Sequence, residues 1–283
     1  MHEAVVKKSI QQEKPGARPD GLAGWARNYF TVERLLSVIT IIIIMLVWYW
    51  VTTSGFVSDV LMPAPQKVWQ CFLTIATEGY KENSLLTHLK DSMARLLGSF
   101  VLVVITAIPL GLASGTNSRI RAIIDPLVEF YRPLPPLAYY TLLVLWMGIE
   151  NPSKVALLYL AGFAPVYLAC VAGVSKIRQD LINGAYTLGA NRRQVFFHVI
   201  LPATLPDIFT GLKTSLGFTY TTLVAAEMVA AVSGIGWMVL DASKFLRSDV
   251  IFVGIIIMGI TGVLLDRIIR LLEEKIVPWR GKE

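Results

Sequence analysis

The residue types that could carry out chemistry are few in this chain and lie far apart along it. The histidines and cysteines are His2, His88, His198, Cys71 and Cys170. None of these has the spacing of a metal site, so we expect no bound metal. A phosphate-binding loop is also missing, because the only Gly-Lys pair, Gly281-Lys282, is followed by glutamate and not by Ser or Thr. The pattern argues against an enzyme, whose acids, bases or metal ligands would converge.

One carboxylate stands out. Glu227 interrupts a stretch from Thr214 to Leu240 that is otherwise free of charge. In a bilayer such a group costs at least about 2.5 kcal/mol and faces the interior of the helix bundle. In one interpretation Glu227 lines a path, where it hydrogen-bonds a gate or meets an ammonium group. In the other it fixes helix packing as a protonated or helix-bonded carboxyl, or it lies at a shallower depth than the middle of the bilayer. Weaker candidates for a path are Tyr220, Thr221, Thr222, Tyr139, Tyr140 and Trp146, although aromatic residues near span ends more often form an interfacial belt.

The elements that must position these residues are apolar helices. Apolar residues make up 54% of the chain and charged residues 16%, which is typical of a membrane protein. Spanning segments need roughly 17–25 apolar residues, because backbone amides in hydrocarbon must bond within their own segment. The six spans predicted from the charge-free runs are 35–55, 94–115, 134–150, 155–175, 209–231 and 250–267. We therefore predict an all-α fold, with a polar cytoplasmic tail over 1–30 and one transmembrane domain over 31–283. Within it, Gly111 and Gly115 form a small-xxx-small pair suited to close helix contact.

The placement of basic residues sets the orientation of these spans. Most of the 26 lysines and arginines fall in the tail, in two loops and at the C-terminal end, all on one side of six spans. One of these loops carries Arg119, Arg121 and Arg132. Basic residues stay on the cytoplasmic side, so both termini are predicted to be cytoplasmic. The net charge of +6 is explained by topology and does not indicate nucleic-acid binding.

The loop between the fourth and fifth spans has strong local signals in "LGANRRQVFFHVILP", residues 188–202. A helix is predicted up to Leu188, ending at Gly189. A second helix begins at Asn191, with Gln194 completing a capping box, and Pro202 is expected to end it. Its apolar residues are Phe196, Val199 and Ile200. The result is a short, rigid segment over 176–207, called the knob below, which could also be a plain amphipathic connector that anchors the bundle.

The knob resembles the cytoplasmic "EAA" loop of permease subunits of bacterial binding-protein-dependent ABC importers. Residues that match its pattern are Ala185, Gly189, Ala190, Phe196, Val199, Leu201 and Pro202. Asn183 and Gly184 depart from it, because they stand where Glu-Ala is usual. The resemblance implies that the knob docks into a groove of a separate ATPase, with Phe196 and Phe197 as buried anchors and Arg192 and Arg193 steering the encounter.

Two further segments, Asp125 to Lys154 and Thr222 to Val239, resemble the nitrate, sulfonate and taurine branch of these permeases, most closely the taurine permeases. The similarity covers roughly Leu61 to Trp279. It implies a type I ABC importer permease-like bundle in the bacterial inner membrane, which works as a homodimer with two ATP-binding subunits and a periplasmic solute-binding protein. ATP-Mg would bind to those partners, so no cofactor is expected in this chain. Nitrate has no ammonium group, which favours a gate or packing role for Glu227.

The expected function is import of a small organosulfonate such as taurine by alternating access, driven by the partner ATPase. Nitrate, another aliphatic sulfonate or a related small solute is the alternative cargo. An ion-coupled secondary transporter is the alternative from another class. It usually has inverted repeats and several ionisable groups at the midplane, whereas this chain has one intramembrane glutamate and no convincing repeat.

Overall fold

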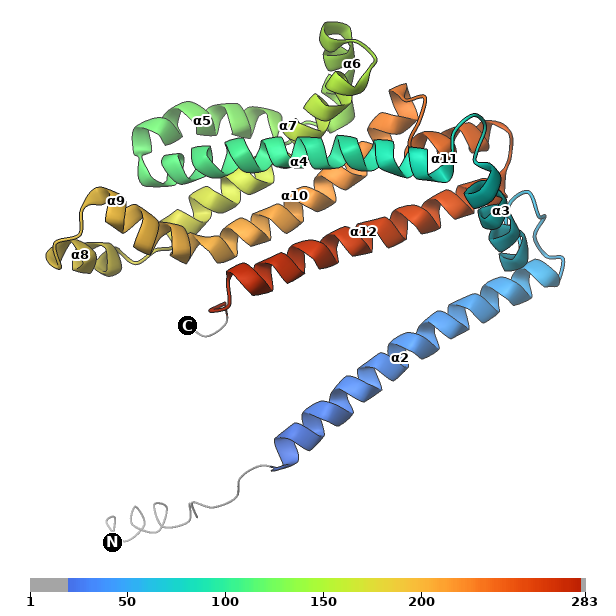
Figure 1. The fold of residues 1–283 in the computed structure, drawn as a ribbon, viewed down its shortest axis with the longest axis horizontal. Coiled ribbons are helices and arrows are strands. Elements are labelled where there is room, and N and C mark those ends of the chain that lie inside the picture. Colours follow the sequence, from blue (N-terminus) through green and yellow to red (C-terminus); the bar gives the residue numbers. More distant parts are fainter. Residues whose placement is uncertain (1–19, 281–283) are drawn as a thin grey trace, which may run out of the picture. The chain divides into compact units, whose positions relative to one another are not determined.

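The computed structural model describes residues 20–280, and every regular element in that range is a helix (Figure 1). The predicted all-α fold is confirmed. Residues 1–19 of the predicted tail lie outside the described residues. The rest of that tail belongs to the first helix, which begins at Asp20.

The chain divides into two compact units, one up to Ser58 and one from Asp59 onward. The first unit contains α2 (Asp20–Thr53), whose part from Leu35 to Thr53 is uncharged and strongly apolar. The second unit contains α3 (Pro65–Glu78), α4 (Leu85–Thr116), α5 (Ser118–Tyr131), α6 (Pro136–Met147), α7 (Asn151–Ser175), α8 (Gln179–Thr187), α9 (Arg192–Val195), the π-helix η1 (Phe196–Ile200), α10 (Leu201–Ala230), α11 (Ile235–Lys244) and α12 (Ser248–Ile276).

Five helices within residues 20–280 are long and apolar enough to cross a membrane, so the predicted count of six is not confirmed. The difference lies in the third predicted span, 134–150. There α6 has 12 residues, or about 18 Å at 1.5 Å per residue, against about 30 Å of hydrocarbon. Three prolines separate α5 from α6: Pro133 and Pro135 precede α6, and Pro136 is its first residue. Prolines lack the N–H groups that would continue the hydrogen bonding of α5. The chain therefore turns between α5 and α6 (Figure 1).

The core of the second unit is the packing of α7 against α4 and α10. Small residues allow the close contact, as predicted for Gly111 and Gly115. A Cβ added at Gly111 would lie 2.6 Å from the Cβ of Cys170, and one at Gly115 would lie 2.6 Å from the Cβ of Val174. Both distances are far inside van der Waals contact, so glycine sets the separation of α4 and α7.

The knob lies at one end of this unit, where α7 ends and α10 begins (Figure 1). Its predicted turns are confirmed: Gly189 has φ +88°, and Asn191 and Gln194 exchange two hydrogen bonds of 2.8 and 2.9 Å as a capping box. The predicted stop at Pro202 is wrong. The chain continues from α9 through η1 into α10, and Leu201 N–H donates to the Phe196 carbonyl five residues back. This wider turn accommodates the proline ring, which would clash with a carbonyl four residues back in a regular helix.

The opposite end of the unit is formed by α3, α11 and the ends of α4, α10 and α12 (Figure 1). Here α3 buries Val68, Cys71 and Ile75 along one face. After α3, the Tyr80 hydroxyl donates to the Asp241 carboxylate of α11 at 2.9 Å, and Lys81 pairs with the same carboxylate at 2.6 Å. Burial, followed by the bond to Asp241, raises the pKa of Tyr80 to about 12. Burial alone would raise the pKa of Asp241, but the hydrogen bonds from Lys81 and Tyr80 hold it below its ordinary value.

Candidate functional site

Glu227 lies within the last turn of α10, at the end of the bundle opposite the knob. Its side chain is 1% exposed. The position is three residues from the end of a 30-residue helix, so the carboxylate is shallower than the middle of a span.

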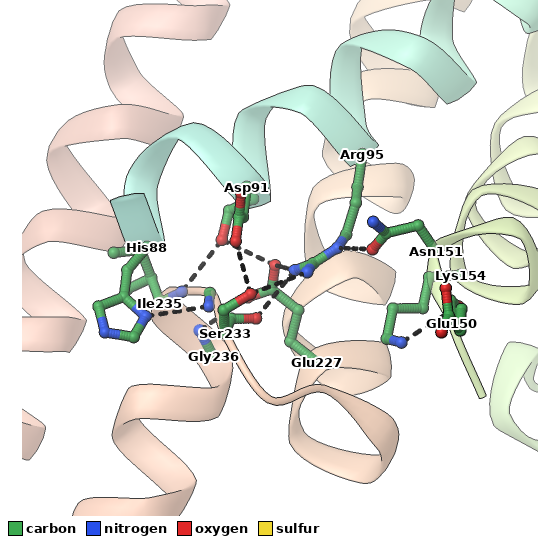
Figure 2. Close-up of polar contacts among 12 residues, drawn as sticks. His88, Asp91, Arg95, Glu150, Asn151, Lys154, Glu227, Ser233, Ile235 and Gly236 are labelled. Atoms are coloured by element: carbon green, nitrogen blue, oxygen red, sulfur yellow. Dashed lines mark hydrogen bonds and ion pairs between the residues drawn. The ribbon is translucent and has the colours of Figure 1, made fainter. Parts of the chain in front are cut away.

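Both oxygens of the Glu227 carboxylate have partners (Figure 2). Arg95 of α4 donates to Oε1 at 2.8 Å, and the Ser92 hydroxyl donates to the same oxygen at 2.7 Å. Gly236 N–H, in the first turn of α11, donates to Oε2 at 2.9 Å. Charge-assisted bonds of this length are about twice as strong as neutral ones. They leave the carboxylate occupied by the protein itself.

The ion pair is the centre of a larger group, called the ion-pair network below. Its members are His88, Asp91, Ser92, Arg95, Asn151, Glu227, Ser233, Gly234, Ile235 and Gly236 (Figure 2). Arg95 also donates to Asn151 at 2.7 Å and to the Ser233 carbonyl at 3.0 Å. The ends of α4, α7 and α10 are thereby tied to the start of α11.

The turn that follows α10 fits around the carboxylate because two of its residues are glycines. Gly234 has φ +123°, and a Cβ there would lie 2.4 Å from the Glu227 carboxyl carbon. Its N–H donates to His88 Nδ1 at 3.1 Å, and the N–H of Ile235 donates to Ser92 at 3.0 Å. Glycine is thus required by both backbone conformation and space.

This geometry favours the packing role for Glu227 over contact with a bound ammonium group. A carboxylate has about four acceptor positions, and Arg95, Ser92 and Gly236 fill three of those of Glu227. Arg95, which is 132 residues away from Glu227, is not among the residues predicted for the site. The signal that could have found it is its place at the border of the charge-free run of its helix, at the same end of the bundle as Glu227.

The other candidates for a path do not form one site. Tyr220 donates to the Met258 carbonyl of α12 at 2.7 Å, and Thr221 and Thr222 bond to carbonyls of their own helix. Tyr140 is 1% exposed, whereas Trp146 is 73% exposed at the far end of α6. Tyr139 lines a cavity between α5, α6, α7 and α10, whereas Tyr220 lines two other, smaller pockets.

The knob presents apolar side chains outward. Leu188 is 90% exposed, Phe197 is 50% exposed and Tyr186 is 45% exposed. The Arg193 guanidinium lies 5.9 Å from the ring centre of Phe197, which orients both side chains. Leu188 was not among the predicted anchors, although it directly precedes Gly189 in the predicted turn.

The remaining predicted knob residues divide by burial. Phe196, Ala185, Ala190 and Leu201 are half-buried and pack against the core of the unit, and Pro202 in the first turn of α10 is also half-buried. Asn183, Gly184 and Arg192 are exposed. Phe197 is therefore free to contact a partner, whereas Phe196 mainly anchors the knob to its own bundle.

Within residues 20–280, no group of three His, Cys, Asp or Glu side chains is placed to hold a metal ion. Cys71 and Cys170 are both free and buried. The described site is thus made of an ion-pair network at one end of the bundle and an apolar knob at the other.

Comparison with known proteins gives this arrangement a family. Residues 107–278 match the family described as binding-protein-dependent transport system inner membrane component. The taurine transport system permease protein TauC of Escherichia coli is 43% identical over 87% of this chain and 90% of its own length. A putative aliphatic sulfonates transport permease protein, SsuC of Bacillus subtilis, is 34% identical over 84% of this chain and 85% of its own.

A more distant relative is the nitrate import permease protein NrtB of Synechocystis, which is 28% identical over 94% of this chain and 98% of its own length. Among solved structures, a chain of the inward-facing MetNI methionine ABC transporter superposes with a TM-score of 0.54 at 15% identity, covering 66% of this chain and 95% of that one. The likeness to this solved structure shows a shared fold. The chain therefore belongs to the family of binding-protein-dependent transport system inner membrane components, as a non-catalytic ABC importer permease subunit of the taurine, sulfonate and nitrate branch.

Proposed function

We propose that this subunit carries a small organosulfonate, taurine foremost, across the bacterial inner membrane by ATP-driven alternating access. In this proposal it acts as a homodimer, with two ATP-binding subunits below and a periplasmic solute-binding protein above. The choice of taurine is supported by the 43% identical taurine permease, which aligns over most of both chains.

The observation that carries the proposal is the apolar surface of the knob. Leu188 is 90% exposed and Phe197 is 50% exposed, one before and one after the capped turn at Asn191. An exposed leucine gains about 2 kcal/mol or more when it leaves water and fills a pocket of a partner. The chain has no phosphate-binding loop. The partner we assign to this surface is therefore the subunit that binds ATP-Mg.

Movement of the knob has a direct mechanical route into the membrane. Because α9, η1 and α10 follow one another without an intervening loop, a displacement of the knob acts on the first turn of α10. At the far end of α10, the ion-pair network ties that helix to α4, α7 and α11. The knob and these helix ends would then move together when the ATP-binding subunits close.

The test is uptake into proteoliposomes that contain the subunit and its co-expressed ATP-binding subunits. We expect accumulation of radiolabelled taurine that requires both ATP and the solute-binding protein. Competition by nitrate and by ethanesulfonate distinguishes taurine from the other cargoes of the branch. Uphill uptake by this chain alone, driven by a proton or sodium gradient, would overturn the proposal in favour of a secondary transporter.

A further inference from the structure

A cavity of about 380 Å³ lies where α5 gives way to α6. Besides these two helices, α7 and α10 contribute to its wall, which carries Arg132, Tyr131, Tyr139 and Thr214 as polar members. No aspartate or glutamate of the described residues lines it, so the charge on its wall is positive. The cavity is large enough for a small solute, since ordinary ligand pockets begin at about 300 Å³.

The cavity lies at mid-depth of the bundle. From α7 it is lined between Leu160 and Leu168, the middle of the 25-residue helix, and from α10 by Thr214 and Phe218, near the middle of 30 residues. Arg132 was predicted in a loop at the membrane surface, but the α5–α6 break places it beside these residues. An arginine at such a depth is unfavourable against lipid, so it is expected to face water or a charged ligand.

Arg132 differs from the other intramembrane arginine of the described bundle. Arg95 is 6% exposed and paired with Glu227, whereas Arg132 is exposed and has no carboxylate within ion-pair distance among residues 20–280. One charged donor without a carboxylate partner thus adjoins the cavity.

We propose that Arg132 binds the oxyanion group of the cargo, a sulfonate or a nitrate, at a site inside the membrane. The planar guanidinium fork matches two oxygens of such a group. The wall has no carboxylate to pair with an ammonium group, so the site selects the anionic end that all cargoes of this branch share. The site rests on the proposed function, because it needs an oxyanion as cargo.

The test uses the complete complex in proteoliposomes, with solute-binding protein, ATP and radiolabelled taurine. For Arg132→Gln we expect at least about a tenfold loss of uptake, and a smaller loss for Arg132→Lys, which keeps the charge without the fork. Arg119→Gln is the matched control. It removes an exposed arginine of the same helix that does not line the cavity, and uptake should not change.

Arg132→Lys separates binding from structure, because it keeps the charge beside the cavity and removes only the fork. If Arg132→Gln fails to assemble, the reduced uptake of Arg132→Lys decides. Normal uptake by the assembled variants overturns the site and leaves the proposed function standing. Failure of the wild-type complex to import taurine, ethanesulfonate or nitrate overturns the proposed function and the site with it.

Discussion

At one end of the bundle Glu227 and Arg95 are buried against each other, with 1% and 6% of their surfaces exposed, whereas at the other end Leu188 is 90% exposed. The first region places charge where water is absent and satisfies it within the chain. The second places an apolar side chain where water is present and leaves it uncovered. Each choice is unfavourable unless something compensates it, and the compensating group lies inside the chain in one case and outside it in the other. The comparison distinguishes a structural site from a docking site.

The largest effect is expected from breaking the ion pair on one side. Arg95→Leu leaves Glu227 buried without its counter-charge, and the free energy of unfolding should fall by about 3–5 kcal/mol. Unfolding of the purified subunit in detergent measures this. The double variant Arg95→Leu/Glu227→Leu removes both charges and should regain much of the loss. A double variant as unstable as the single one would show that the pair is not what holds this region together.

The second prediction concerns docking at the knob. Leu188→Asp should weaken binding of the ATP-binding subunit by about 2 kcal/mol, close to thirtyfold, without lowering the stability of the bundle. Val232→Asp is the matched control, because Val232 is 82% exposed on the turn at the opposite end. Binding of detergent-solubilised subunits measures both. Equal losses for the two variants would contradict a docking surface at the knob.

Backbone conformation sharpens the comparison within the knob. Gly189 has φ +88° with nothing within 4 Å of an added Cβ, so Gly189→Val should cost about 1–2 kcal/mol through backbone strain alone. Gly184 also has open space and lies within α8, so Gly184→Ala should stabilise the helix by about 0.5–1 kcal/mol. Thermal unfolding measures both. Opposite signs are expected, and destabilisation by Gly184→Ala would refute the helical reading of α8.

The smallest effect is a dependence of stability on pH at the end opposite the knob. The pKa of Asp241 is held below its ordinary value, so its bonds to Lys81 and Tyr80 stabilise the fold above the unfolded pKa of about 4. This contribution is lost as the pH falls through the lower, folded pKa. Lys81 is 44% exposed, which limits the gain to about 1 kcal/mol or less. The melting temperature of Asp241→Asn should therefore fall less steeply with acid than that of the wild type.

Local features of the fold could be read from the sequence, whereas features set by contacts between distant residues could not. Gly189, Asn191 and Gln194 act within a few residues of one another, so their turn and capping box follow from spacing alone. The Glu227–Arg95 pair joins residues 132 apart, and no periodicity links them. The prolines from Pro133 to Pro136 break the third predicted span, and the absence of charge in that run does not reveal the break. The π-helix η1 is not predicted, because a proline such as Pro202 ordinarily ends a helix.

The most direct test of the docking claim is photocrosslinking in the assembled transporter. A photoreactive amino acid is placed at position 188 in one sample and at position 232 in another, and uptake confirms that each complex is intact. We expect a crosslink to the ATP-binding subunit from position 188 and none from position 232. An active complex that gives no such crosslink from position 188, or gives it equally from both positions, would contradict the assignment of the knob as the surface through which ATP hydrolysis drives this permease.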